Sequence, residues 1–298
     1  MVDGASSGLN AGAAGGEVAA RRSLAANPLP LFGFFTRLPV GTAASLEAVV
    51  AAFPLVPMVG WATGASAAIA VLVLAPVLPA AGLAAVLLAL VVGLTGLNQT
   101  DGLLDLGDGL MVHGDAEKRL RVMHDYSAGV GAIGATLFTY LLSYGALTAL
   151  LQTIAGEAGG VGGGSRWFTQ NAFKGAAALL AAEILCRLPY VVLAWRGRPS
   201  HGGLGSAFVD GFRLRHALVG LCAAAPGIAA AAWLGWLPLV LALVAVAFVA
   251  FFLLRTADRL LGGIGGDVMG ASQELARAGV LLALCIGLGL QLSLGWVS

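Results

Sequence analysis

Three aspartates lie at helical spacing directly after a long apolar segment. They belong to the run Asn98–Gly109, in which Asp101, Asp105 and Asp108 would fall within roughly a 60° arc of one helix face. Carboxylates that converge repel one another unless a cation or a proton lies between them. Hard oxygen ligands of this kind suit Mg²⁺, which is usually shared with a substrate phosphate. Because charge at a bilayer boundary is costly, the cluster predicts a functional cation site rather than a set of helix caps.

A second acidic segment lies far along the chain, in the glycine-rich run Gly262–Ser272. Glycines let a backbone approach and cradle a phosphate, a role predicted for Gly266, although close helix packing is an alternative use. Asp267 in the same run is predicted to join the cation site. Arg255 and Arg259 precede it at helical spacing, and their guanidinium groups could bind anionic oxygens.

Two further polar segments are candidates for substrate contact. The first is the basic stretch 118–121, which is followed by Asp125 and a glycine-rich turn. Arg119 is predicted to contact the substrate, although a solvated face toward lipid headgroups explains this stretch as well. The second candidate combines Arg187 with the basic, glycine-rich loop 196–206. This loop suits a nucleotide phosphate, and a juxtamembrane electrostatic anchor accounts for its arginines equally well.

The composition identifies the class of protein that carries these groups. The chain has 298 residues, of which 59% are hydrophobic and only 10% are charged, against about 25% charged in soluble domains. This predicts an all-α, polytopic membrane protein. A net charge of +1 gives no bulk attraction to nucleic acid. The 3 cysteines stand singly in apolar segments without ligand spacing, which indicates buried, unreactive thiols.

Apolar windows of about 20 residues, long enough to cross a bilayer, number about seven. They lie at 48–73, 79–97, 129–153, 170–194, 217–234, 236–254 and 278–296. Proline interrupts the first window at Pro54 and Pro57. Residues 1–28 are rich in glycine and alanine, lack the features of a signal peptide and are expected to form a disordered tail. Residues 29–298 are expected to form a single transmembrane, helical catalytic domain.

The basic residues predict the orientation of these spans. All but two of the 16 lysines and arginines fall on or near one set of alternating loops, including Arg277 in the last of them. Only Arg166 and Lys174 fall on the other side. The positive-inside rule then places the N-terminus and the active site at the cytoplasmic face of the plasma membrane. Every aspartate and all 4 histidines fall on the same side, so the chemistry is expected at one face.

Together these segments resemble the cobalamin synthase family, the adenosylcobinamide-GDP ribazoletransferases. The likeness spans about residues 29–280, and the two acidic signatures in this order are its specific part. The matching phrases are Phe35-Thr36-Arg37-Leu38-Pro39, Phe53-Pro54-Leu55-Val56 with Gly60, Asp101-Gly102-Leu103-Leu104-Asp105 through Asp108-Gly109 with Met123-His124-Asp125, Leu261-Gly262-Gly263-Ile264 with Gly266-Asp267 and Gly270-Ala271, and more weakly Gly202-Gly203-Leu204-Gly205. One position departs from the family pattern: Gln99 stands where histidine is frequent, and glutamine cannot act as a base.

The resemblance implies phosphoryl transfer on a membrane-associated corrinoid. Adenosylcobinamide-GDP would react with α-ribazole or its 5′-phosphate, releasing GMP and forming adenosylcobalamin or its phosphate. Mg²⁺, or Mn²⁺ in its place, would neutralise charge on the pyrophosphate. Its ligands would be Asp101, Asp105, Asp108 and Asp267. Asp125 would accept the proton of the ribose hydroxyl, with Asp108 as a second catalytic carboxylate.

The same resemblance implies the remaining contacts. Phosphate and guanosine-side oxygens would be bound by Arg187, Arg255, Arg259, Arg119 and the backbone at Gly266. The lipid bilayer is an expected partner. Another copy of the chain, or other enzymes of corrinoid assembly, are further candidate partners.

Two other classes of protein compete with this interpretation. A CDP-alcohol phosphotransferase would use similar aspartate and metal chemistry, but its motif places Ala-Arg two residues after Asp-Gly, where this chain has Leu104 followed by Asp105. A cation-coupled transporter predicts carboxylates near the bilayer midplane and broken helices in both halves. Here the aspartates are expected to collect at one face instead.

Overall fold

The computed structural model describes residues 27–40, 45–125, 127–156, 171–200 and 203–295. Most of the predicted tail, 1–28, lies outside these residues. The described part is built from helices, and its only extended pairing is a single bridge between Pro199 and Ile264. The all-α prediction is therefore confirmed for this part of the chain.

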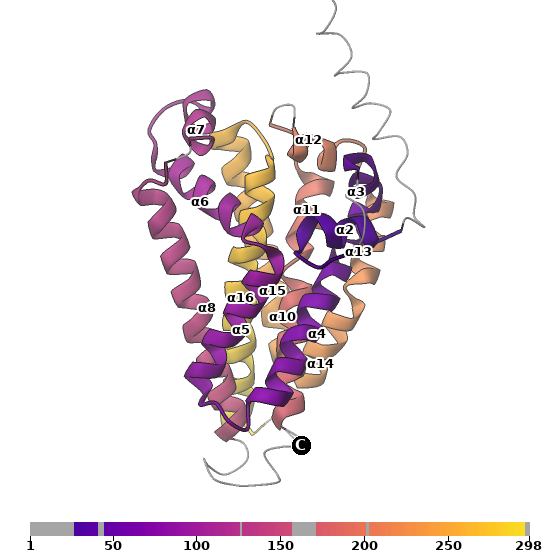
Figure 1. Ribbon diagram of the computed structural model, residues 1–298, viewed down its shortest axis with the longest axis vertical. Coiled ribbons are helices and arrows are strands. Elements are labelled where there is room, and N and C mark those ends of the chain that lie inside the picture. Colours follow the sequence, from indigo (N-terminus) through magenta and orange to yellow (C-terminus); the bar gives the residue numbers. More distant parts are fainter. Residues whose placement is uncertain (1–26, 41–44, 126, 157–170, 201–202, 296–298) are drawn as a thin grey trace, which may run out of the picture.

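The helices follow one another with short connections. In chain order they are α2 (Leu29–Phe35), α3 (Leu46–Ala52), η1 (Phe53–Leu55), α4 (Pro57–Leu74), α5 (Ala80–Thr95), α6 (Asn98–Met111), α7 (Ala116–Met123), α8 (Val130–Gly156), α10 (Ala172–Leu185), α11 (Leu188–Arg196), α12 (Leu204–Val209), α13 (Leu214–Ala223), α14 (Ala225–Leu234), α15 (Trp236–Thr256), η3 (Ala257–Leu261) and α16 (Gly266–Ser293). The long helices run side by side, and the short helices α2, α3, α7 and α12 gather at one end of the bundle (Figure 1).

Five helical segments in the described residues are long and apolar enough to cross a membrane, or up to 7 if each of two bent pairs counts as one span. The upper number agrees with the predicted windows. The first window is shorter than predicted because Pro54 lies in η1 and Pro57 occupies the first turn of α4. Proline is tolerated there, since the first helical N–H groups have no partner within the helix. The window therefore divides into α3 with η1 and then α4.

A sharp bend separates α5 from α6. Gly96 and Leu97 have φ angles of 66° and 65°, in the left-handed region, and the axis turns by 93°. The backbone N–H of Arg37 donates to the Leu94 carbonyl, 2.7 Å away, and so ties the preceding chain to this bend. The polar helix α6 consequently leaves the direction of the span and lies toward the end of the bundle that carries α7 (Figure 1). We treat α6 as lying outside the membrane-spanning segments.

The final helix differs from its prediction. It begins at Gly266, whereas the predicted window began at 278 because Glu274 and Arg277 carry charge. Both residues are 1% exposed, and they form ion pairs inside the bundle. The assignment of Arg277 to a cytoplasmic loop is wrong, because a charged partner on another helix makes its burial tolerable.

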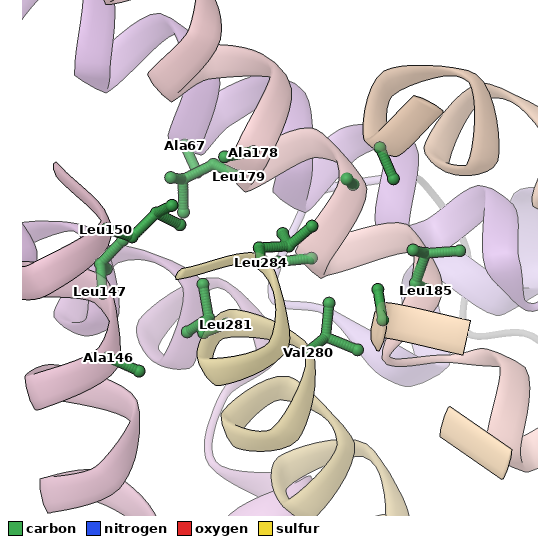
Figure 2. Packing of buried hydrophobic residues seen from close by; sticks show 14 of the residues in the cluster. Ala67, Ala146, Leu147, Leu150, Ala178, Leu179, Leu185, Val280, Leu281 and Leu284 are labelled. Atoms are coloured by element: carbon green, nitrogen blue, oxygen red, sulfur yellow. The ribbon is translucent and has the colours of Figure 1, made fainter. Parts of the chain in front are cut away.

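Two clusters of buried apolar residues hold the helices together. The larger one fills the bundle where α4, α5, α8, α10 and α16 meet. Figure 2 shows part of it, with Leu147 and Leu150 of α8, Leu179 of α10 and Leu284 of α16. The second lies nearer the short helices and is rich in aromatic rings. There Phe53 stacks on Phe208 with 4.1 Å between ring centroids, which joins η1 to α12.

Candidate active site

The two acidic segments meet where α6 packs against the start of α16. A Cβ added to Gly102 would lie 2.7 Å from the carbonyl oxygen of Asp267, and one added to Gly270 would lie 3.4 Å from Cα of Gln99. Glycine at both positions therefore allows the two helix backbones to touch. Asp267, in the first turn of α16, is brought beside the α6 helix that carries Asp105.

The carboxylates of Asp101, Asp105 and Asp267 lie close enough for their charges to interact. Partial burial, followed by the charges of Asp267 and Asp101, raises the pKa of Asp105 to about 7, while His124 opposes the shift. The carboxylate of Asp267 also lies 3.9 Å from Nε2 of His124, which follows α7. Three mutually repelling carboxylates are the kind of donor set that a hard divalent cation stabilises.

The side chains are not drawn together at ligand distances. Within the described residues, no group of three or more His, Cys, Asp or Glu side chains is placed so that it could hold a metal ion. The donor chemistry of Asp101, Asp105 and Asp267 fits Mg²⁺, and rotation of these partly exposed side chains would be needed to form a coordination shell. Binding of Mg²⁺ thus stays a prediction, for which these three carboxylates are donors of the right kind.

Asp108 has different contacts from its two neighbours on α6. It is 9% exposed, and its two oxygens accept hydrogen bonds from the backbone N–H groups of Gly129 at 2.6 Å and Ala132 at 2.8 Å. These groups belong to the first turn of α8, where N–H donors lack partners and negative charge is favoured. The charge of Asp108 contributes the smallest of the effects that raise the pKa of Asp105, and helix capping is the role that its hydrogen bonds support.

Arg119 also binds backbone groups of the protein, and its side chain does not extend into solvent. Its guanidinium donates to the carbonyl oxygens of Gly109 at 2.8 Å and Leu110 at 3.2 Å, and its Nε donates to Gly114 at 3.3 Å. The last carbonyls of a helix lack internal partners, and a cation there is favourable. Arg119 therefore closes the end of α6 and is not placed to contact a substrate in this arrangement.

Asp125 lies on the exposed surface just after α7. Its Oδ1 accepts a hydrogen bond from the backbone N–H of Ser127 at 3.2 Å, a local turn contact. The preceding residue, His124, is the one that reaches Asp267. Asp125 is therefore next in sequence to a residue of the acidic site, and its exposed carboxylate can be reached by a bound substrate.

The glycine run that precedes Asp267 brings a third segment to the same end. The N–H of Ile264 donates to the Arg198 carbonyl at 2.6 Å, and the N–H of Ser200 donates to the Ile264 carbonyl at 3.3 Å. Gly263 has φ of +145°, and an added Cβ would lie 2.6 Å from the Arg198 oxygen. A Cβ at Gly266 would meet only the Leu204 side chain at 3.7 Å, so the backbone at the start of α16 is approachable.

The remaining predicted arginines are dispersed. Arg187 is 0% exposed between α10 and α11 and donates to Oε1 of Gln273, so the structure does not place it at the acidic site. Arg255 is exposed on α15 with its guanidinium 5.1 Å from the ring centre of Phe251. Arg259 is exposed on η3, a segment that packs against α7. Of the three, Arg259 is the best placed to reach an anion near His124.

A groove on the side of the bundle lies away from these acids. It has a volume of about 370 Å³ and runs between α5 and α8, lined by apolar side chains such as Leu88 and by Tyr140. The Tyr140 hydroxyl lies 2.6 Å from Oγ1 of Thr100, at the first turn of α6. The groove thus approaches α6 from the side of the bundle but contains none of the predicted site residues.

The sequence-based prediction missed two buried acids, Glu183 on α10 and Glu274 on α16. Both are 1% exposed and both pair with Arg277. A signal was present, because Glu183 falls in the apolar window 170–194 and ionisable residues within spans are functional candidates.

Comparison with known proteins gives the family. The family model described as cobalamin-5-phosphate synthase matches residues 28–285. The chain belongs to this family. It is 36% identical over 252 residues to an adenosylcobinamide-GDP ribazoletransferase of Halorubrum lacusprofundi, covering 84% of this chain and 93% of the relative. A protein of the same name from Methanococcoides burtonii is 30% identical over 260 residues, covering 86% of this chain and 90% of the relative. No solved structure matches the chain.

Proposed function

We propose that this protein transfers the adenosylcobinamide phosphate group from adenosylcobinamide-GDP to α-ribazole or its 5′-phosphate, with release of GMP. The support is that the chain belongs to the cobalamin-5-phosphate synthase family and that relatives matching most of its length carry the ribazoletransferase name. The structural observation behind the proposal is the meeting of α6 with the start of α16, which places Asp267 in the field of Asp105.

The reaction breaks one phosphoanhydride bond and forms one phosphoester bond. A ribose hydroxyl oxygen of the acceptor attacks the phosphorus that bears the cobinamide, the bond to the GMP oxygen breaks, and the hydroxyl proton is released. Asp125, exposed beside His124, would accept that proton. Arg259 and the backbone at Gly266 would bind the phosphate oxygens and hold them in line for attack.

Asp101, Asp105 and Asp267 would hold Mg²⁺, which when bound supplies positive charge that stabilises the transferring phosphoryl group. Their mutual repulsion keeps these carboxylates poised for a cation, because each is more stable ionised when a positive charge lies between them. Mn²⁺ has similar oxygen-ligand preferences and is expected to replace Mg²⁺.

The acidic end of the bundle is proposed to face the cytoplasm of a cell whose plasma membrane the chain spans. The basic residues gathered at this end, including Arg196, Arg198, Arg213 and Arg215, support this orientation by the positive-inside rule. Association with another copy or with other enzymes of corrinoid assembly remains a prediction.

The decisive experiment is a turnover assay with purified protein in liposomes. The assay supplies adenosylcobinamide-GDP, α-ribazole and Mg²⁺, and it follows GMP release together with the corrinoid product. We expect stoichiometric GMP and cobalamin, which EDTA abolishes and Mg²⁺ or Mn²⁺ restores. Folded protein that forms no product with either α-ribazole or its 5′-phosphate would refute the proposed reaction, whereas EDTA-resistant turnover would refute only the metal assignment.

A further inference from the structure

A network of charged and polar side chains lies inside the bundle, on the helix that carries Asp267. Arg277 of α16 donates from Nε to Oε1 of Glu183 on α10 at 2.6 Å, and its Nη1 pairs with the carboxylate of Glu274. Arg187 donates from Nη1 to Oε1 of Gln273 at 2.5 Å. All five side chains are at most 1% exposed. The two arginines and two glutamates balance in charge, so the network adds no net charge to the interior.

Stability alone does not account for such a network. Buried ion pairs cost desolvation, and well-packed apolar residues of similar volume stabilise a protein as well or better. The attested advantage of a buried polar group is that it fixes the register of one helix against another. The Arg277–Glu183 contact joins α16 to α10, and the Arg187–Gln273 contact joins α16 to the junction of α10 and α11. The network is therefore suited to fix the register of α16 against these helices.

The helix α10 is itself a firm support for this network. Gly60 of α4 packs directly on the backbone of Glu183, and a Cβ at that glycine would collide with the Glu183 carbonyl. A Cβ at Gly64 would lie 3.3 Å from Cβ of Glu183. Glu183 is therefore held against α4 by backbone contacts and can act as a fixed point for Arg277.

The spacing along α16 connects the network to the acidic site. Asp267 and Glu274 are seven residues apart, so they lie within about 20° of each other around the helix and about 10 Å apart along it. Gly270, between them on this face, packs on the backbone of Gln99 in α6. One face of α16 thus carries Asp267 against α6 and, two turns deeper, Glu274 in the ion-pair network.

We infer that Glu183, Arg277 and Glu274 are positioning residues that set the rotation and axial height of α16, so that Asp267 stands against the helix that carries Asp105. Arg187 and Gln273 form a second tie on the same helix. This inference rests on the proposed function in one respect, namely that Asp267 helps to bind a cation. A rotation of α16 by one residue would move Asp267 by about 100° and remove it from α6.

The test compares an isosteric variant and an apolar replacement with the unchanged protein. E183Q removes one charge at constant size, and E183L/E274L/R277M replaces the whole ion-pair group with apolar side chains, which favours retained folding. Mn²⁺ binding is measured by electron paramagnetic resonance without substrates. We expect the Mn²⁺ Kd to rise by about 10-fold or more in both variants, the size of effect typical of groups that orient metal ligands.

Two controls separate positioning from general stability. L83A opens a cavity at the start of α5, in the larger apolar cluster and remote from the acids. E117Q removes an exposed ion pair with Arg121 on α7. Both controls are expected to leave the Mn²⁺ Kd within about twofold of the unchanged protein, since neither removes a contact of the ion-pair network. If L83A weakens Mn²⁺ binding as much as E183Q at equal loss of thermal stability, the network has only a structural role.

A distance measurement gives a readout that is independent of metal and turnover. Spin labels at V77C, in the connection between α4 and α5, and at L294C, at the end of α16, report the axial position of α16 by double electron–electron resonance. Both sites are exposed, and the labels go into a background with Cys222 and Cys285 replaced by alanine. We expect E183L/E274L/R277M to shift or broaden the distance distribution by at least one helical rise, about 1.5 Å. An unchanged distribution would overturn the inference even if the transferase proposal holds, and a shifted one would uphold it even if that proposal fails.

Discussion

At the scale of single residues, the three aspartates of α6 have separate roles despite their common face. Burial raises the pKa of Asp105, and the charges of Asp267 and Asp101 raise it further. Asp108 instead binds the backbone at the start of α8. Residues that share one face of a helix therefore differ here in their contacts.

Replacing Asp105 by asparagine should abolish most of the transfer while leaving the fold intact. The change removes one charge from a repelling group, so the stability of the protein without metal should not fall. Loss of one group that stabilises charge in phosphoryl transfer typically lowers kcat on the order of 10²- to 10³-fold. GMP release by D105N, alongside its thermal unfolding, measures both effects, and wild-type turnover in a folded variant would exclude Asp105 from the site.

The raised pKa of Asp105 predicts a pH dependence of stability. Between the unfolded-state pKa near 3.8 and the folded-state pKa of about 7, the folded protein holds a proton that the unfolded chain has lost. The free energy of unfolding of the metal-free protein therefore decreases as pH rises through this window. A bound cation would offset this loss, so the Mg²⁺-induced rise in Tm should be larger at about pH 8 than at about pH 6. In D105N the dependence should flatten, and an equal Mg²⁺ effect at both values in the unchanged protein would contradict the assignment.

At the scale of elements, the C-terminal part of α6 is fixed by two side chains that bind backbone groups. Asp108 caps α8, and Arg119 closes the carbonyl end of α6. In the same part of the helix, Gly107 and Gly131 let α6 and α8 cross so closely that a Cβ on Gly107 would lie 2.6 Å from the Gly131 oxygen. The part of α6 that follows Asp105 is thus held against α7 and α8.

Removing the cap on α8 should destabilise the protein. D108A leaves the buried N–H of Ala132 and the partly buried N–H of Gly129 without their side-chain partner, so the free energy of unfolding should fall by about 2 kcal/mol. D108N retains one acceptor oxygen and should cost less. The exposed cap Ser45, whose hydroxyl accepts from Ala48 at 3.3 Å, offers a matched control in S45A with a smaller loss. If D108A keeps full stability but loses Mn²⁺ binding, Asp108 is a metal ligand and not a cap.

The close approach of α6 to α16 can be tested with a single methyl group. G102A would place Cβ 2.7 Å from the Asp267 oxygen and push the start of α16 away. We expect a loss of kcat of about tenfold or more, because small displacements of catalytic groups are costly. G93A in α5, where no atom lies within 4 Å of the added Cβ, is the control and should retain activity. Full activity in G102A would show that the contact does not position Asp267.

At the scale of the whole molecule, the acidic site lies at one end of the bundle, with α7 and α12 at the same end and the connection between α4 and α5 at the other (Figure 1). The polar segments that meet there, α6 and the start of α16, come from distant parts of the chain. The helices that connect them contain none of the clustered aspartates. A substrate with a large corrin ring could approach this end from the membrane surface, because α6 and α7 lie outside the spans.

The proposed orientation predicts which cysteine labels react in intact cells. With Cys222 and Cys285 replaced by alanine, V77C and S127C place thiols at opposite ends of the bundle, and both positions are exposed. A membrane-impermeant maleimide should label V77C in intact cells and S127C only after permeabilisation, because the positive-inside rule places the acidic end in the cytoplasm. The reverse pattern would place the active site outside.

The sequence by itself determined the class of the protein, the approximate spans and the pairing of two acidic segments. Long apolar windows have few alternatives to membrane-spanning helices, and helical spacing fixes which residues share a face. The prolines at 54 and 57 also marked where α4 begins. The class, the spans and the shared helix face are local properties of the chain, whereas the pairing of the two acidic segments was expected from the predicted orientation of the spans and from the family resemblance.

Only the tertiary structure decided what the polar side chains bind. Asp108 and Arg119 were predicted at the active site, but their partners are backbone groups of helix ends. Arg187 was predicted to bind substrate and Arg277 to lie in a loop, but their partners are Gln273 and Glu183 in the bundle interior. A hydrogen-bond partner on another helix leaves no trace in local spacing or composition. The physical reason is that burial of a charge depends on the group packed against it, which is set by how the helices assemble.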